Sequence, residues 1–248
     1  MFSLEIDSSD EGRDLLIAEL WDLGSAGIIE LGDTRVRAFF EADADHAALR
    51  ARYPDAAIRE EPDHDWVVEA RELLAPMEVG RRFFLVPEWR SDPAPPGRFR
   101  ITVNPGMAFG TGVHETTRLC LEALEEFVKP GMAVLDVGTG SGILANAARL
   151  LGASRVIACD IDEDAVRIAC QGFVGSADAV RSASVDLVVA NISPEVIIAL
   201  APELTRVQRP GGTLIASGFN ASEVDQVKAA LCDVLEVREK GEWAMVLR

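Results

Sequence analysis

From Thr116 to the end of the chain, short apolar runs alternate with longer segments whose apolar residues recur at helical spacing. The expected strands cover residues 133–137, 155–159, 172–175, 185–190, 213–217, 234–239 and 242–247, and the expected helices cover 116–128, 141–151, 163–170, 194–207 and 221–231. The run Asp186–Ala190 is almost entirely apolar, which is typical of a parallel strand buried between two layers of helices. The alternation therefore predicts a doubly wound α/β domain.

The first 65 residues predict a separate, smaller α+β unit. Alternating apolar residues indicate strands at 2–6, 26–31 and 36–40, and helical spacing indicates helices at 10–23 and 43–52. Gly32-Asp33 is a two-residue hairpin signal between the second and third strands. This order favours a ferredoxin-like domain over residues 1–60, and a charged helix over 61–76 is expected to link it to a domain of residues 77–248 that begins with strands near 82–86 and 99–103.

Composition and charge exclude several classes of function. No apolar run approaches the ~18 residues of a membrane-spanning helix. The four cysteines form no CxxC pair and there are only three histidines, so we expect no metal site and reduced core thiols in a cytoplasmic protein. The net charge of −17 repels nucleic acid. Residues 1–65 hold 17 acidic residues against 6 arginines, a net of −11, which is either a solvated acidic face or a docking surface for a basic partner.

A glycine-rich loop follows the expected strand 133–137 and opens the next helix. Asp136 precedes Gly138, Gly140 and Gly142, and glycines allow a sharp turn and the close approach of a ligand to the backbone. The spacing also fits the dinucleotide fingerprint, which leaves a nicotinamide oxidoreductase as an alternative. Asp136 favours S-adenosylmethionine, because a carboxylate repels a pyrophosphate but attracts the ammonium group of the methionine moiety, whose carboxylate the helix amino terminus can hold.

Residues at the ends of the next expected segments are candidate contacts for the nucleoside. Asp160 follows strand 155–159, 20 residues after Gly140, the spacing expected of a carboxylate that accepts hydrogen bonds from ribose hydroxyls. Its neighbour Ile161 could lie against the adenine. Asp162 is expected to cap the following helix, a role that Asp160 could also fill. Asp178 either accepts a hydrogen bond from the adenine amino group or lies in a solvated turn.

The segment Asn104–Thr117, which reads NPGMAFGTGVHETT, resembles the PrmA family of methyltransferases, whose substrate is protein eleven of the large ribosomal subunit. The resemblance continues through Asp136–Leu144, Asp160–Asp162 and Val188–Ile192 and covers the whole chain. It implies a ferredoxin-like substrate-docking domain, a linker helix, and a seven-stranded Rossmann-like methyltransferase domain that uses S-adenosylmethionine.

Carried over by position, the resemblance assigns cofactor contacts to Thr117, Gly138, Asp160 and Asn191. It places Phe109 and Thr111 in a mobile loop, 109–114, that folds over the methionine end of the cofactor. The resemblance also makes Asn191 the catalytic residue, whose side-chain carbonyl faces the substrate amine; its alternative role is a cap for helix 194–207. His114 is either a base or, more simply, a cap.

This chain departs from the family pattern at Glu115, at Ser193 and in a short span between Cys170 and Asp178. The function expected is N-methylation of lysine or N-terminal amines of a basic large-subunit ribosomal protein. A methyltransferase of another basic protein or of a small amine, and a cofactor-binding module without transfer activity, remain alternatives. We expect a monomer that contacts neither nucleic acid nor membrane.

Overall fold

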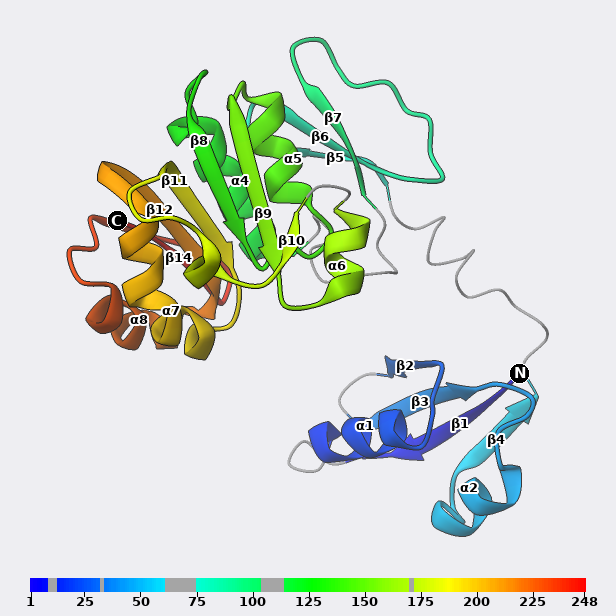
Figure 1. Ribbon diagram of the computed structural model, residues 1–248. Helices are drawn as coiled ribbons and strands as arrows, with labels where there is room; N and C mark the ends of the chain where they lie inside the picture. The colour runs from blue at the N-terminus through cyan, green and yellow to red at the C-terminus, as the bar shows by residue number, and fades with distance from the viewer. Residues whose placement is uncertain (9–12, 32–33, 61–74, 104–113, 170–171) are drawn as a thin grey trace. The chain divides into compact units, whose positions relative to one another are not determined.

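The computed structural model describes residues 1–8, 13–31, 34–60, 75–103, 114–169 and 172–248. The chain divides into two compact units, Met1–Glu72 and Leu73–Arg248, which are described separately (Figure 1). The expected linker helix at 61–76 lies almost entirely outside the described residues. No described helix is long and apolar enough to cross a membrane.

In the described part of the first unit, a four-stranded antiparallel sheet is accompanied by two helices. Its elements, in chain order, are β1 (Phe2–Asp7), α1 (Arg13–Asp22), β2 (Gly27–Glu30), β3 (Arg35–Phe40), α2 (His46–Arg52) and β4 (Ala57–Glu60). The strand order is β2-β3-β1-β4, and the element order β-α-β-β-α-β is that of the ferredoxin-like motif. Strand β4 is absent from the sequence prediction, because its four residues alternate too weakly to be recognised and only Ile58 among them is not exposed.

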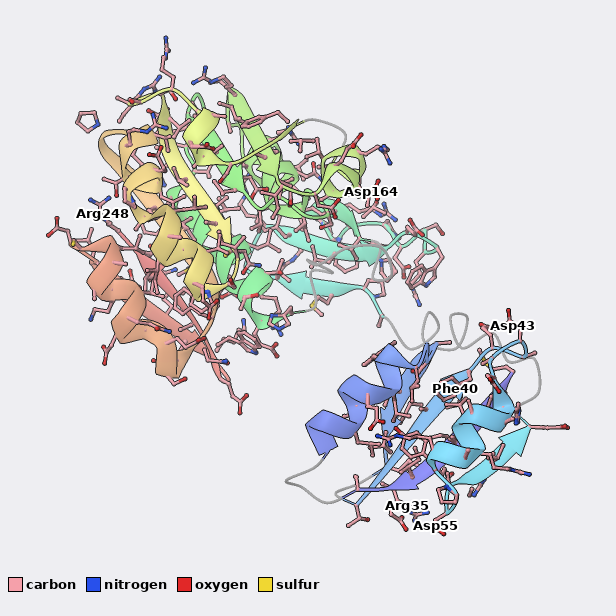
Figure 2. All side chains as sticks on the ribbon, turned by 60° about the horizontal axis from the view of Figure 1, so that its bottom comes forward. Arg35, Phe40, Asp43, Asp55, Asp164 and Arg248 are labelled. Atoms are coloured by element: carbon pink, nitrogen blue, oxygen red, sulfur yellow. The ribbon has the colours of Figure 1, made fainter. Side chains whose placement is uncertain are left out.

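Apolar side chains from one face of this sheet form the core of the first unit. Phe2, Leu4 and Phe40 are buried there against Leu20 of α1 and Leu49 of α2. Figure 2 shows Phe40 within the unit and the exposed Asp43 and Asp55 on its surface.

On the other face of β1, the buried Glu5 forms ion pairs with Arg35, Arg37 and Arg59. The hydrogen bond from Arg37 is the main cause that lowers the pKa of Glu5. Three arginines of the unit therefore stabilise the ionised form of one buried carboxylate.

The second unit contains the predicted doubly wound sheet. Its strand order is β10-β9-β8-β11-β12-β14-β13; β8 to β12 run parallel, and β14 is antiparallel to both of its neighbours, β12 and β13. The strands are β8 (Ala133–Val137), β9 (Arg155–Asp160), β10 (Phe173–Val174), β11 (Val185–Asn191), β12 (Gln208–Asn220), β13 (Glu236–Lys240) and β14 (Trp243–Leu247).

Helices cover both faces of this sheet. The helices are α4 (Glu115–Phe127), α5 (Ile143–Leu150), α6 (Glu163–Ile168), α7 (Pro194–Val207) and α8 (Val224–Leu231), with short 3-10 turns at Ala177–Ala179 and Ala221–Glu223. One apolar core packs α4 and α5 on one face, and a second packs α7 and α8 on the other (Figure 1). In β8, Val134 belongs to the first core and Leu135 to the second, which explains why the strand is apolar on both faces.

A small sheet extends the first of these cores. It consists of β5 (Met77–Val79), β6 (Phe83–Pro87) and β7 (Phe99–Val103), in that order. Strand β5 is missing from the sequence prediction because only three residues pair with β6.

The prediction that all the thiols are core residues is wrong for Cys232. Cys120 and Cys159 are buried, but Cys232 follows α8 with φ of +52° and is exposed. Cys170 lies outside the described residues.

Candidate cofactor and acceptor site

A cavity of about 380 Å³ lies at the carboxyl ends of β8, β9 and β11. This edge is where ligands bind in doubly wound folds, because the loops that leave adjacent strands diverge there. Among the residues predicted from sequence, those that line the cavity are Thr117, Gly138, Gly140, Asp160, Ile161 and Asn191. The structure thus brings together contacts that are spread over 75 residues of the chain.

The glycine loop forms the floor of this cavity. Gly138 and Gly140 have φ of +70° and +50°, a region that favours glycine. A Cβ atom at Gly138 would lie 2.2 Å from Cγ2 of Ile192, so the loop and the end of β11 approach too closely for a side chain. The backbone N–H groups of Gly138 and Thr139 both donate to the carbonyl of Cys159, at 2.9 and 3.0 Å, which fastens the loop to β9.

Asp160, at the end of β9, is held in place by two backbone hydrogen bonds. Its Oδ2 accepts from the N–H of Gly140 at 2.9 Å, and its Oδ1 accepts from the N–H of Asp162 at 3.0 Å. The helix cap is Asp162, which accepts from the N–H of Asp164, as predicted. Ile161, beside Asp160, is 84% exposed on the cavity wall and offers an apolar surface to a planar ring.

Asp136 has a different position from the one the sequence suggested. It does not line the cavity but is fully buried beneath the loop, where its Oδ2 accepts from the Thr139 hydroxyl at 2.8 Å and from the N–H of Ala145 at 3.0 Å. It therefore occupies an amide group at the amino end of α5 that could otherwise bind an anion. Its Oδ1 has no hydrogen-bond partner among the described residues. Burial raises the pKa of Asp136 from 3.8 to about 6, although these two hydrogen bonds lower it in part.

The raised pKa predicts how Asp136 affects stability. The folded chain holds the Asp136 proton more tightly than the unfolded chain does. The protonated carboxyl therefore adds to the free energy of unfolding; this addition is fully present below about pH 4 and is lost as pH rises through about 6. A rise of this size in the pKa corresponds to roughly 2–3 kcal/mol of unfolding free energy. In denaturant titrations, Asp136→Asn should therefore gain stability relative to the wild type between pH 4.5 and 8.

Asp186→Asn is the matched control for this titration. A hydrogen bond from the N–H of Ala133 lowers the pKa of Asp186 below its ordinary value of 3.8, so this carboxyl is charged in the folded and the unfolded chain above about pH 4.5. The difference in unfolding free energy between Asp186→Asn and the wild type should therefore stay constant between pH 4.5 and 8. If the unfolding free energies of the wild type and Asp136→Asn changed with pH in the same way, the raised pKa of Asp136 would be contradicted.

Asn191 is the last residue of β11, and its side chain lies at the cavity. Its Nδ2 donates to the hydroxyl of Thr117 at 3.3 Å, which fixes the orientation of the amide. Its Oδ1 is buried and has no hydrogen-bond partner among the described residues. Ser193 occupies the N-cap position of α7 and Pro194 is the first helical residue, so Asn191 is not the cap of that helix. A buried acceptor without a partner is costly, and one that lines a cavity is suited to a ligand that donates.

His114 is the cap of α4. Its Nδ1 accepts from the N–H of Thr116 at 3.3 Å and lies 2.8 Å from the Thr116 hydroxyl, so this nitrogen is not available to remove a proton from a substrate. The adjacent departure from the family pattern, Glu115, lies in the first turn of α4, where a carboxylate is favourable.

Trp243 and Gly218 are among the cavity residues that the sequence did not identify. Trp243, which begins β14, lies with its ring 4.4 Å from that of His114 in an edge-to-face arrangement. Gly218 has φ of +103°, and a Cβ atom there would lie 2.3 Å from the carbonyl oxygen of Ile192. The positions of glycines within a strand can signal such a close approach, but no local signal identified Trp243.

The remaining predicted contacts are not part of the cavity lining or lie outside the described residues. Gly142 is the left-handed N-cap of α5, and a Cβ atom there would meet Ala169 at 3.0 Å, so it serves helix packing. Asp178 is exposed on a 3-10 turn near the cavity residues Gly175 and Ser176 and is not part of the lining. Phe109 and Thr111 lie in the segment 104–113, outside the described residues.

Comparison with known proteins relates this site to a family. The family described as "Ribosomal protein L11 methyltransferase (PrmA)" matches residues 21–248. The chain belongs to this family. A ribosomal protein L11 methyltransferase of Caldicellulosiruptor saccharolyticus is 33% identical over 99% of this chain and 98% of the relative. One from Pelotomaculum thermopropionicum is 40% identical over 86% of this chain and 78% of the relative.

A solved structure supports the same conclusion. The crystal structure of a ribosomal protein L11 methylase from Lactobacillus delbrueckii subsp. bulgaricus has a TM-score of 0.65 and 30% identity, and covers 70% of this chain and 97% of its own. The PrmA-family match confirms the methyltransferase predicted from the residues and removes the nicotinamide oxidoreductase alternative.

The cavity fits the cofactor of the PrmA family, S-adenosylmethionine. Its lining includes the backbone of Gly138 and Gly140, the Asp160 carboxylate, and the apolar side chain of Ile161. The Oδ1 atom of Asn191 is a further acceptor in the lining and has no partner among the described residues. Such a lining suits a ligand with hydroxyl groups and a planar ring, both of which S-adenosylmethionine has.

Proposed function

We propose that this chain methylates ribosomal protein L11 on lysine ε-amines, on the N-terminal amine, or on both. Family membership supports the methyl transfer and the protein substrate. The observation that carries the choice of an amine as acceptor is the buried, unpartnered Oδ1 of Asn191 beside the cavity. An amine that attacks with its lone pair still has N–H groups to donate to this oxygen.

The residues on the β9 side of the cavity would hold the cofactor. Asp160 would accept from the ribose hydroxyls, Ile161 would contact the adenine, and Gly138 and Gly140 would lie along the methionine moiety. Bound S-adenosylmethionine supplies a methyl group on a positively charged sulfur, which keeps the bonding electron pair when the methyl group leaves.

Asn191 would then orient the acceptor amine. Its Oδ1 accepts one N–H, and the bond between its Nδ2 and Thr117 prevents the amide from turning away. This fixes the lone pair in line with the bond to be broken, which is the main requirement of the reaction. A lysine with a pKa near about 10.4 must first lose its proton. The apolar lining supplied by Ile192, Val196 and Leu200 disfavours the charged form, and the proton leaves to solvent.

The first unit would dock the substrate protein. It carries much of the chain's negative charge, and Glu41, Asp43, Asp55 and Glu60 are among its exposed acidic residues. A basic protein would be attracted and oriented by this surface, which raises the rate of encounter. Residues 1–60 are therefore proposed as the docking domain, residues 61–76 as a helical linker and residues 77–248 as the methyltransferase domain.

Asn191→Ala should lower kcat on ribosomal protein L11 by about tenfold, the effect of one hydrogen bond made to the reacting group. The dissociation constant for S-adenosylmethionine should change less than kcat. Thr117→Val, which leaves the Asn191 amide without its hydroxyl partner, should show the same pattern with a smaller loss. Turnover on L11 at the wild-type rate, with only the melting temperature lowered, would show that Asn191 is structural.

A further inference from the structure

Part of the cavity lining has no role among the proposed cofactor contacts. The glycine loop, Asp160 and Ile161 are assigned to the cofactor, and Asn191, which is hydrogen-bonded to Thr117, is assigned to the acceptor amine. The same lining includes His114 and Trp243, whose rings contact each other. We call these two residues the aromatic wall.

The aromatic wall is rigid, because each ring is fixed by a regular element. The His114 ring is held by its hydrogen bonds to Thr116 at the start of α4. Trp243 lies opposite Asn220 of β12 and Lys240 of β13 in the sheet. Lys240 in turn forms an ion pair with Glu122 of α4 at 2.8 Å, which links the β13–β14 hairpin that carries Trp243 to the helix that His114 caps.

The wall is also close to the reacting group. Thr117, which orients Asn191, follows His114 by three residues, or about one turn of helix α4, which rises roughly 5 Å. An amine hydrogen-bonded to Asn191 Oδ1 would therefore have the aromatic surface of His114 and Trp243 in the same cavity. An α-amine at a chain terminus has no side-chain stem to place there. A lysine ε-amine has four methylene groups, which pack well on aromatic rings.

We propose that the aromatic wall binds the aliphatic stem of an acceptor lysine, so that Trp243 determines the preference of the enzyme for lysine ε-amines over an N-terminal α-amine. The inference rests on the proposed amine methylation and adds a specificity residue to it. Trp243 is not a catalytic residue in this account, because it contacts the stem and not the transferred methyl group.

The test is a competition between two amines of the same substrate. Ribosomal protein L11 is incubated with the intact enzyme and S-adenosylmethionine under initial-rate conditions, and methylation at each amine is measured by peptide mass spectrometry. Trp243→Leu should lower the ratio of lysine to N-terminal methylation roughly three- to tenfold, the effect of one lost aromatic contact. Losses of folded enzyme or of cofactor affinity cancel in this ratio.

Two further variants make the result specific. Trp243→Phe keeps an aromatic surface and should retain most of the wild-type ratio. His114→Asn removes the other ring but keeps a residue that can cap α4, and should shift the ratio in the same direction as Trp243→Leu. Leu235→Ala, at a residue that is 84% exposed between α8 and β13, is the control and should leave the ratio unchanged.

An unchanged ratio in both Trp243→Leu and His114→Asn would overturn the inference while leaving the proposed function intact. A wild-type enzyme that methylates no amine of L11 would refute the proposed function, and the inference with it.

Discussion

Replacement of Asp160 by alanine should weaken the binding of S-adenosylmethionine roughly ten- to a hundredfold. The variant removes a charged acceptor from the ribose hydroxyls, and hydrogen bonds to charged groups are worth about 1.5–3 kcal/mol. It also removes the two bonds that Asp160 accepts from Gly140 and Asp162, which hold the loop and the end of β9 together. Calorimetric titration of the enzyme with the cofactor measures the effect directly.

Asp162→Ala is the matched control for this experiment. Asp162 lies two residues away and caps α6 through the N–H of Asp164, and it does not line the cavity. Its loss should cost about 1 kcal/mol of stability and leave the cofactor affinity within about twofold. An unchanged dissociation constant in Asp160→Ala, or an equal loss in the two variants, would remove Asp160 from the ribose site.

Deletion of residues 1–60 should abolish methylation of ribosomal protein L11 and leave cofactor binding intact. Every described residue of the cavity lies between His114 and Trp243, in the second compact unit. The deleted residues carry most of the acidic excess of the N-terminal region, which we propose attracts and orients the basic substrate. Calorimetry with S-adenosylmethionine and initial rates on L11, compared between the truncated and intact chains, separate the two functions.

Salt supplies a second readout for the same deletion. Screening acts over about 8–10 Å near physiological ionic strength, so added salt should slow the intact enzyme on L11 and affect methylation of a small free amine much less. If the truncated enzyme methylates L11 as fast as the intact chain, at low and at high salt, the docking proposal is wrong and the acidic face serves only solubility.

Sequence patterns predicted the site residues correctly where the signal lies within a short stretch of the chain. The glycines at 138 and 140, the acid at the end of β9 and the helix cap at Asp162 were identified because strand, turn and cap rules act over a few residues. The role of Asp136 was not predicted correctly, because the sequence does not reveal that its carboxylate lies under the loop and accepts hydrogen bonds from Thr139 and Ala145.

Contacts between distant segments could not be predicted in this way. Trp243 meets His114 only because β14 is antiparallel to β12 and places the start of its strand beside the start of α4. Gly218 is required by the backbone of Ile192, which directly follows the neighbouring strand β11. The short strands β4 and β5 exist because longer neighbours pair with them, and their own residues do not signal a strand.

The intact mass of ribosomal protein L11 after incubation with this enzyme and S-adenosylmethionine tests the proposed amine methylation directly, with Asn191→Ala run in parallel. We expect mass increases in whole methyl groups, located on amino groups by fragmentation, and a rate about tenfold lower with the variant. No mass increase on L11, or methyl groups located only on atoms other than amine nitrogen, would contradict it.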